Sequence, residues 1–173
     1  MMQFLTWLEQ LQFSTWIRES GSLWAYPLVL SLHAMGMSFV VGVSFAVDLR
    51  ILGFGSGLPL RPFEKFFPFM WLGFWVNTIS GIILLIADAT TKFSNYVFYI
   101  KMGFIIVAVW LIGRIHKTLF LHPELVDSNH APMQAKALAW ISIICWLGSI
   151  TAGRLMAYLG PVSGLTGATG LRQ

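Results

Sequence analysis

The chain has 173 residues, of which 57% are hydrophobic and only 10% are charged, whereas an ordinary soluble domain carries about 25% charged residues. The core of a soluble protein of this length cannot enclose so many apolar side chains, and a bilayer supplies the missing apolar surroundings. The 11 Lys and Arg residues are dispersed along the sequence, which argues against nucleic-acid binding. Cys145 is the one cysteine in the sequence, so an intrachain disulfide is excluded within it. The composition predicts an integral membrane protein.

Residues 1–18 mix apolar and polar side chains and include Trp7 and Trp16. The segment has neither a positively charged start nor an uninterrupted apolar stretch, which disfavours a signal peptide. Tryptophan is enriched at the headgroup level of membranes. The segment therefore predicts an amphipathic helix that lies in the membrane interface. An extension that packs on the rest of the protein is the alternative.

Four intervals are apolar enough to cross a bilayer, which takes about 20 residues of helix. Residues 20–47 and 66–87 contain no charged side chain. Two later intervals contain one cation each, Lys101 and Arg154. The predicted spans cover residues 23–47, 66–87, 93–116 and 137–160.

The connectors between these spans are short and rich in helix breakers, at residues 53–59, 90–95 and 122–132. Short links place successive apolar helices antiparallel. The predicted fold is an all-α integral membrane protein, a four-transmembrane-helix up-down bundle that forms a single membrane domain over residues 1–173. The glycine-rich residues 161–173 are predicted to form an irregular tail.

Lys and Arg residues are unevenly divided between the two ends of this bundle. Basic loops face the cytoplasm, so we expect both termini on the periplasmic side. The more basic end carries Arg50, Arg61, Lys65, Arg114, Lys117 and Lys136, and the other end carries Arg18, Lys92 and Arg172.

Several polar residues fall inside the predicted spans. With a helical rise of 1.5 Å per residue, His33 and Asn77 lie near the midplane, and Lys101 and Arg154 lie roughly 8–10 Å from it, both in the outer half. Ionisable residues inside a membrane are costly and often functional. Ordinary alternatives exist: the two cations can extend to the headgroups, and His33 can form a hydrogen bond across the bundle, to Asn77 or Ser31.

These residues predict a pocket for an anionic or metal-containing ligand. His33 would supply an axial nitrogen to the iron of a b-type haem, or a hydrogen bond to a quinone, while Lys101 and Arg154 would hold anionic groups. Asn77 would support His33. Gly36 follows His33 by about one turn and would make room for a flat ring, although close helix packing is an alternative use for this glycine.

A second axial ligand for a haem is harder to find. The other three histidines lie at the inner end of the third predicted span or in the loop that follows it, so none reaches the depth of His33. A haem at His33 would be five-coordinate, or it would take Met102 or Met156 as its sixth ligand.

Asp48 lies at the inner end of the first predicted span, close to two cations. We expect it to form an interfacial ion pair with Arg50 or Arg114 that fixes the helix ends.

Short motifs in six places carry a resemblance to a known family. They are residues 16–20 (WIRES), 23–27 (LWAYP), 32–36 (LHAMG), 47–53 (VDLRILG), 98–101 (FYIK) and 152–158 (AGRLMAY). Together they resemble an uncharacterised family of small bacterial four-helix inner-membrane proteins. This resemblance implies the span count and a bacterial inner membrane, and it implies no activity. A looser similarity to copper-resistance membrane domains and b-type cytochromes is one of architecture.

The sequence contains no nucleotide-binding, nucleophile or zinc-protease motif, so enzymatic activity of the chain alone is not expected. We expect a membrane-embedded redox or electron-transfer subunit that holds a b-type haem or a quinone near His33, together with a membrane-protein partner or further copies of itself. One alternative is a small transporter or copper-handling protein, which would use the same residues along a path. Another is a structural accessory subunit of a larger complex.

Overall fold

The computed structural model describes residues 2–127 and 131–158, and throughout these ranges the ordered elements are helices. Four of them are long and apolar enough to cross a membrane, so the prediction of four such helices is confirmed. Their ends differ from the predicted ends by a few residues. The predicted end of the fourth span at residue 160 and the predicted irregular tail at residues 161–173 lie outside the described residues. The four helices are α3 (Tyr26–Leu52), α4 (Phe67–Ala87), α6 (Tyr96–Ile115) and α8 (Met133–Tyr158).

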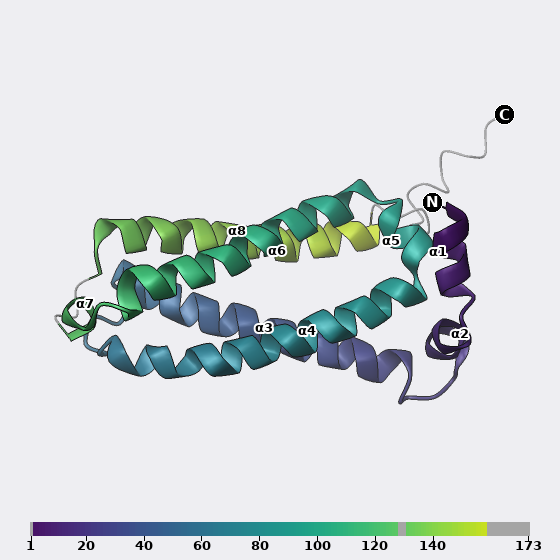
Figure 1. Ribbon diagram of the computed structural model, residues 1–173, viewed down its shortest axis with the longest axis horizontal. Helices are drawn as coiled ribbons and strands as arrows, with labels where there is room; N and C mark the ends of the chain where they lie inside the picture. Colours follow the sequence, from purple (N-terminus) through teal and green to yellow (C-terminus); the bar gives the residue numbers. More distant parts are fainter. Residues whose placement is uncertain (1, 128–130, 159–173) are drawn as a thin grey trace.

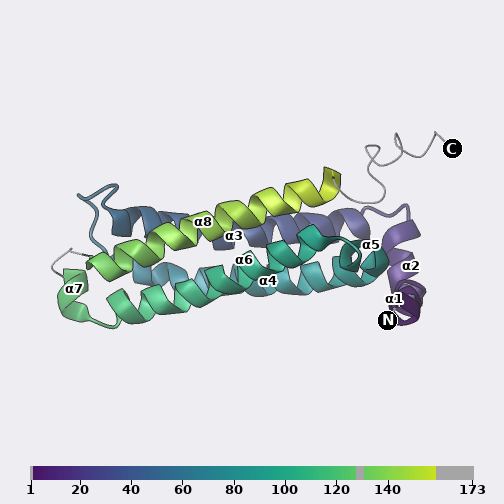
Figure 2. The ribbon, with the colours of Figure 1, turned by 90° about the horizontal axis from the view of Figure 1, so that it is seen from above.

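The four long helices lie side by side and alternate in direction (Figures 1 and 2). Helix α3 packs along α4, and α6 packs along α8. The two pairs meet mainly where α3 contacts α8, whereas α4 and α6 share little contact although they follow each other in the sequence. The bundle therefore consists of two helical hairpins, α3–α4 and α6–α8.

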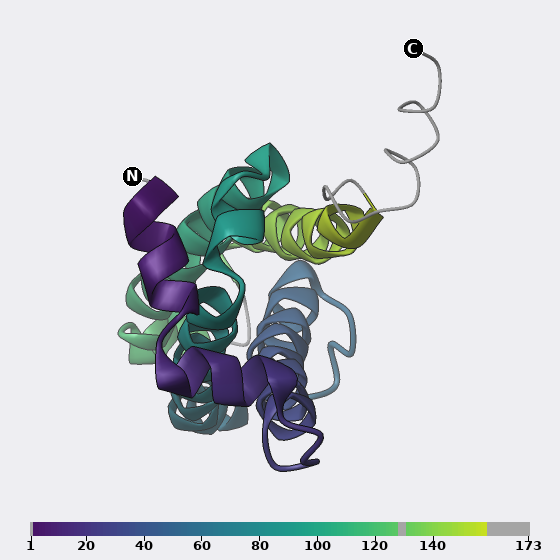
Figure 3. The same ribbon diagram turned by 90° about the vertical axis from the view of Figure 1, so that its right-hand side faces the viewer.

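The N-terminal segment forms two short helices, α1 (Met2–Glu9) and α2 (Gln12–Glu19). Both lie across one end of the bundle, roughly perpendicular to its long axis (Figures 1 and 3). We call this the outer end and the opposite one the inner end, after the predicted orientation. The prediction of one helix over residues 1–18 was wrong in this respect. The break between the two helices changes the direction of the chain, which allows α1 to contact α5 while α2 contacts α4.

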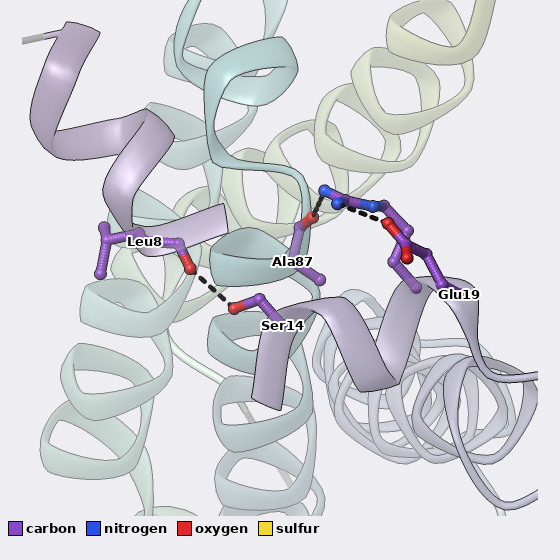
Figure 4. Close-up of polar contacts among 5 residues, drawn as sticks. Leu8, Ser14, Glu19 and Ala87 are labelled. Atoms are coloured by element: carbon purple, nitrogen blue, oxygen red, sulfur yellow. Dashed lines mark hydrogen bonds and ion pairs between the residues drawn. The ribbon is translucent and has the colours of Figure 1, made fainter. Parts of the chain in front are cut away.

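Polar contacts hold the second of these helices in place (Figure 4). The Ser14 hydroxyl donates a hydrogen bond of 2.8 Å to the carbonyl oxygen of Leu8 across the break. Arg18 donates to the carbonyl oxygen of Ala87 at the end of α4, at 3.4 Å. Ser14 and Ile17 are buried against the bundle. Helix α2 is therefore fixed to both α1 and α4.

The link between α4 and α6 contains a short helix, α5 (Ala89–Phe93), where the sequence predicted a loop. Glu9 of α1 accepts two hydrogen bonds on Oε1, from the Thr90 backbone N–H at 2.6 Å and from the Thr90 hydroxyl at 2.7 Å. Asn95 then caps α6, because its side-chain oxygen accepts from the Val97 backbone N–H at 3.0 Å. The outer end of the bundle is thereby tied together by side chains from three elements.

The inner end is formed by the connectors that follow α3 and α6. Helix α3 ends at Gly53, whose φ of 106° is left-handed and favours glycine. Phe67 at the start of α4 packs edge-on against the rings of His116 and Phe120, with centroids 4.8 and 5.2 Å away. The remaining elements here are the 3₁₀ helix η1 (Arg61–Phe66), the π-helical turn η2 (His116–Phe120) and α7 (Pro123–Asp127).

Packing differs between the two halves of the bundle. The main hydrophobic core lies in the inner half and includes Ile51, Met70, Leu111 and Ala139, one from each long helix. In the outer half α6 is loosely covered, since none of its residues from 98 to 107 is buried. The polar residues that the sequence singled out in the outer half therefore lie where the bundle is less tightly closed.

Candidate functional site

His33 of α3 is bonded to Asn77 of α4. Nδ1 of the His33 ring lies 2.9 Å from the backbone oxygen of Asn77. In return, the Asn77 side-chain amide donates a hydrogen bond of 2.7 Å to the backbone oxygen of His33. Ser31, the other expected partner, donates instead to the carbonyl oxygen of Pro27. The two helices of the first hairpin are thus joined by reciprocal polar contacts in the middle of the apolar region.

These contacts favour one tautomer of a neutral His33. The Asn77 backbone oxygen can only accept, so the 2.9 Å contact is a hydrogen bond when Nδ1 carries the ring proton and Nε2 carries the lone pair. The Asn77 side-chain nitrogen also lies 3.3 Å from Nδ1, but it donates its shorter hydrogen bond to the His33 backbone oxygen. The Ser80 hydroxyl lies 3.3 Å from Nδ1 and donates to the Val76 carbonyl oxygen at 2.6 Å, so it can share the Nδ1 proton as a second acceptor. Nε2 has no hydrogen-bond partner within the described residues. His33 therefore offers a free lone pair on a ring that is held in position.

Glycines set the distance between α3 and α4 around this histidine. A Cβ at Gly81 would lie 2.9 Å from Cε1 of His33, so a side chain at this position would collide with the imidazole ring. A Cβ at Gly36 would lie 2.7 Å from the Asn77 backbone nitrogen and 2.8 Å from the Gly73 oxygen. Gly36 therefore packs against the backbone of α4, and the space once expected for a flat ring is filled there by that helix.

Lys101 of α6 lies against α8 in the outer half. Its Cε and Nζ are each 3.8 Å from where a Cβ on Gly153 would be. The positive charge of Lys101 acts electrostatically on His33. No ion pair to Lys101 forms within the described residues. Lys101 thus places a positive charge on the hairpin opposite the neutral His33, without an ion-pair partner among the described residues.

Other predicted site residues lie further from this centre. Arg154 follows Gly153 on α8 and is exposed, on the outside of the bundle. Met102 is exposed and Met156 is half-buried, and no contact places either of them at His33 within the described residues. The structure therefore joins His33 and Asn77 directly, links Lys101 to His33 only through its charge, and does not add Arg154 to them.

Asp48 does not form the expected ion pair. Arg50 donates from Nε to the carbonyl oxygen of Leu58 at 2.6 Å, and the Arg114 guanidinium lies 5.6 Å above the Trp110 ring. Asp48 is 1% exposed, and its Oδ2 has no hydrogen-bond partner among the described residues. The loop after α3 turns back over Arg50 and supplies its acceptors, which explains why the prediction failed.

The residues at His33 fit a haem or a quinone in part. A neutral imidazole held through Nδ1 is the usual arrangement of a histidine that ligates metal, and a nearby cation suits an anionic substituent. No group of three or more His, Cys, Asp or Glu residues that could hold a metal ion occurs in the part of the chain that the structure describes. A metal at this site would therefore have to arrive within a cofactor that supplies most of its own ligands.

Comparison with known proteins adds nothing to this geometry. No protein-family model matches the chain, and no curated protein or solved structure matches it either.

Proposed function

We propose that this protein is a membrane-embedded redox or electron-transfer subunit that holds a b-type haem or a quinone in the outer half of its bundle. The observation that carries the proposal is the hydrogen bond from His33 Nδ1 to the Asn77 backbone oxygen, which leaves Nε2 free. An intramembrane histidine that is oriented by a second group and has a free lone pair is a functional-site candidate.

His33 and Lys101 have different roles in this proposal. His33 presents Nε2, either as a ligand or as a hydrogen-bond acceptor for the hydroxyl of a reduced quinone. Lys101 places a positive charge close by, which favours a propionate or the negative charge that a quinone gains on reduction. When bound, either group supplies the one-electron chemistry that the side chains of this chain lack. Asn77, Ser80 and Gly81 keep the imidazole in one orientation.

The membrane setting follows the same reasoning. We place the four helices across a bacterial inner membrane with both termini on the periplasmic side, because the more basic end of the bundle is then cytoplasmic. Helices α1 and α2 then lie in the outer interface. Their aromatic side chains Phe4, Trp7, Phe13 and Trp16 are exposed and suit the headgroup level. An electron carrier needs a donor and an acceptor, so a partner membrane protein or further copies of this chain belong to the proposal.

The test is what copurifies with the protein from membranes. We expect either a Soret band in the optical spectrum or a quinone in an organic extract of the detergent-purified protein. His33→Ala should remove that ligand. The matched control is His122→Ala, because His122 is an exposed loop histidine paired with Glu124 at 3.2 Å, and this variant should retain the ligand. The absence of both pigment and quinone from the unaltered protein would contradict the proposal.

A second variant separates the orientation of His33 from its presence. Gly81→Ala keeps the histidine but drives a methyl group against Cε1. It should weaken ligand retention by roughly tenfold or more, the size of effect seen when groups that orient a metal ligand are changed. Gly103→Ala, at a position with open space, is the control.

If His33→Ala changes metal or ion uptake by cells while no chromophore or quinone is found, the transporter or copper-handling alternative replaces this proposal. If no chromophore or quinone is found and His33→Ala leaves metal and ion uptake unchanged, the accessory-subunit alternative remains.

A further inference from the structure

Asp48 lies in a second polar site, in the inner half of the bundle and apart from His33. It borders a small cavity of about 10 Å³, which is about the space that one water molecule occupies. Apart from the Asp48 carboxyl and the Ser44 hydroxyl, the wall of this cavity is apolar. It consists of Val47 of α3, Phe67 and Met70 of α4, and Ile112 and Ile115 of α6.

Among the described residues, Asp48 is the one titratable group in the cavity lining. On α3, Arg50 is directed to the Leu58 carbonyl oxygen. On α6, Arg114 lies over a tryptophan ring and the His116 ring packs on Phe67. Helix η1 contributes three charged residues, and all of them are exposed: Arg61, Glu64 and Lys65. On α8, Lys136 lies closer to the inner end than Ser142, which is the residue of that helix that interacts with the Asp48 carboxyl.

The charge state of Asp48 follows from these surroundings. An ionised carboxylate without a cation or a full set of hydrogen bonds costs several kcal/mol in an apolar environment. A hard metal cation takes about six oxygen ligands or more, whereas the cavity wall offers one carboxyl and one hydroxyl. A proton on the carboxyl removes the charge without any further ligand, so the protonated acid is the form that the site accommodates.

Helix α8 carries further buried polar side chains, which extend from this site toward the outer half of the bundle. The side-chain polar atoms of Ser142, Trp146 and Ser149 are buried and have no hydrogen-bond partner among the described residues. We call these three residues the α8 seam. Their spacing places them on one face of the helix, over a rise of about 10 Å. By contrast, Ser31 and Ser38 of α3 donate to the carbonyl oxygen four residues earlier, which is the common solution for a helical serine.

The α8 seam runs from the neighbourhood of Asp48 toward that of Lys101. At its inner end, Ser142 interacts electrostatically with the Asp48 carboxyl, although its hydroxyl forms no hydrogen bond among the described residues. Beyond its outer end, Gly153 lies one turn after Ser149 and contacts Lys101. Each buried polar atom without a partner costs about 1–3 kcal/mol, and internal water is what usually satisfies such atoms.

We propose that Asp48 is a proton-binding site, a carboxyl that is protonated at neutral pH and hydrogen-bonded to a water molecule in the adjoining cavity or to Ser142 at the inner end of the α8 seam. Protonation here is the addition of one proton to one carboxylate oxygen, with the Ser142 hydroxyl or a water molecule accepting the resulting O–H. Protonation of Asp48 requires no ligand at His33, so this proposal can be tested independently of the redox proposal.

Infrared spectroscopy of the purified protein in lipid tests the proton directly. We expect the carbonyl stretch of a protonated carboxylic acid at pH 7, shifted in D₂O, and lost in Asp48→Asn. The control is Asp88→Asn, because Asp88 is half-exposed and paired with Lys92 at 3.3 Å, and this variant should leave the band unchanged. Absence of the band, or its survival in Asp48→Asn, would overturn the proposal. So would carboxylate bands that change when sodium replaces potassium, since they would show a bound cation.

A second variant tests the α8 seam and does not depend on how Asp48→Asn folds. Ser142→Ala should move the Asp48 carbonyl band to higher frequency, because the C=O bond of a carboxylic acid stiffens when its O–H group loses a hydrogen-bond acceptor. Ser38→Ala is the matched control, since the Ser38 hydroxyl is exposed and bonds within its own helix. A band that does not move in Ser142→Ala would contradict the link between Asp48 and the seam.

Discussion

Three glycines determine how closely α3 and α4 approach each other at the histidine. Gly36 and Gly73 bring the two backbones together, and Gly81 leaves room for the imidazole. The hydrogen bonds between His33 and Asn77 depend on this approach, because a side chain at either of the first two positions would push the helices apart. Small residues serve the same purpose at helix contacts in membranes generally.

The effect of these glycines on stability can be measured. Gly36→Val should lower the free energy of unfolding by about 1–3 kcal/mol, the cost of forcing extra atoms into a packed contact, because its new atoms meet the backbone of α4. Gly42→Val on the same helix has open space around it and is the control. Thermal unfolding in detergent should show a clear fall for the first variant and little change for the second; equal losses would contradict the packing role of Gly36.

At the scale of elements, part of the structure was predictable from the sequence. The spans were found because charged residues mark their ends, and the link between His33 and Asn77 was among the alternatives because both residues lie at similar depth. The rotation of each helix was not predictable, because apolar residues surround these helices on all sides and no polar face marks the interior. For that reason the exposure of Arg154 and the isolation of Asp48 emerged only from the three-dimensional arrangement.

The N-terminal helices illustrate a different limit. The composition of residues 1–18 predicted an amphipathic helix, but the break between α1 and α2 is set by contacts to residues far along the chain. Glu9 bonds to Thr90, and Arg18 bonds to Ala87. Tertiary contacts of this kind leave no local signal in the sequence.

Removing the contact of Glu9 should release α1 from α5. A hydrogen bond to a charged group contributes about 1.5–3 kcal/mol, reduced here by partial solvent exposure to about 1 kcal/mol. We therefore expect Glu9→Ala to speed backbone amide exchange in α1 by roughly fivefold, measured by mass spectrometry, while the spans exchange as before. Glu19→Ala is the control, because Glu19 forms only an exposed pair with Arg18. Unchanged exchange in α1 would show that its apolar contacts alone hold it.

For the whole molecule, an even number of spanning helices places α1 and the end of α8 on the same side of a membrane. The described part of α8 ends at the same end of the bundle as α1 and α2 (Figure 1). The distribution of Lys and Arg determines which side this is. The orientation can therefore be tested at two exposed positions on opposite ends of the bundle, Ser94 and Lys65.

Cysteine labelling provides that test, since Cys145 is buried and can be replaced by serine. In sealed bacterial cells, a membrane-impermeant maleimide should label Ser94→Cys, and it should label Lys65→Cys only after the cells are permeabilised. The reverse pattern would place the termini in the cytoplasm. Equal labelling of both positions in sealed cells would contradict insertion across the membrane.

The division into two hairpins has a consequence for how the protein is made. Each hairpin has contacts that need only its own two helices. His33 bonds to Asn77 in the first hairpin, and Phe104 packs on Gly148 in the second. Asp48 belongs to the first hairpin and Ser142 to the second, so the first can enter the bilayer before the group that faces its carboxyl has been synthesised. If the two hairpins insert in chain order, we expect Asp48 to be covered only in part, by Phe67 and Met70 of α4, until Ile112 and Ile115 of α6 close the cavity beside it.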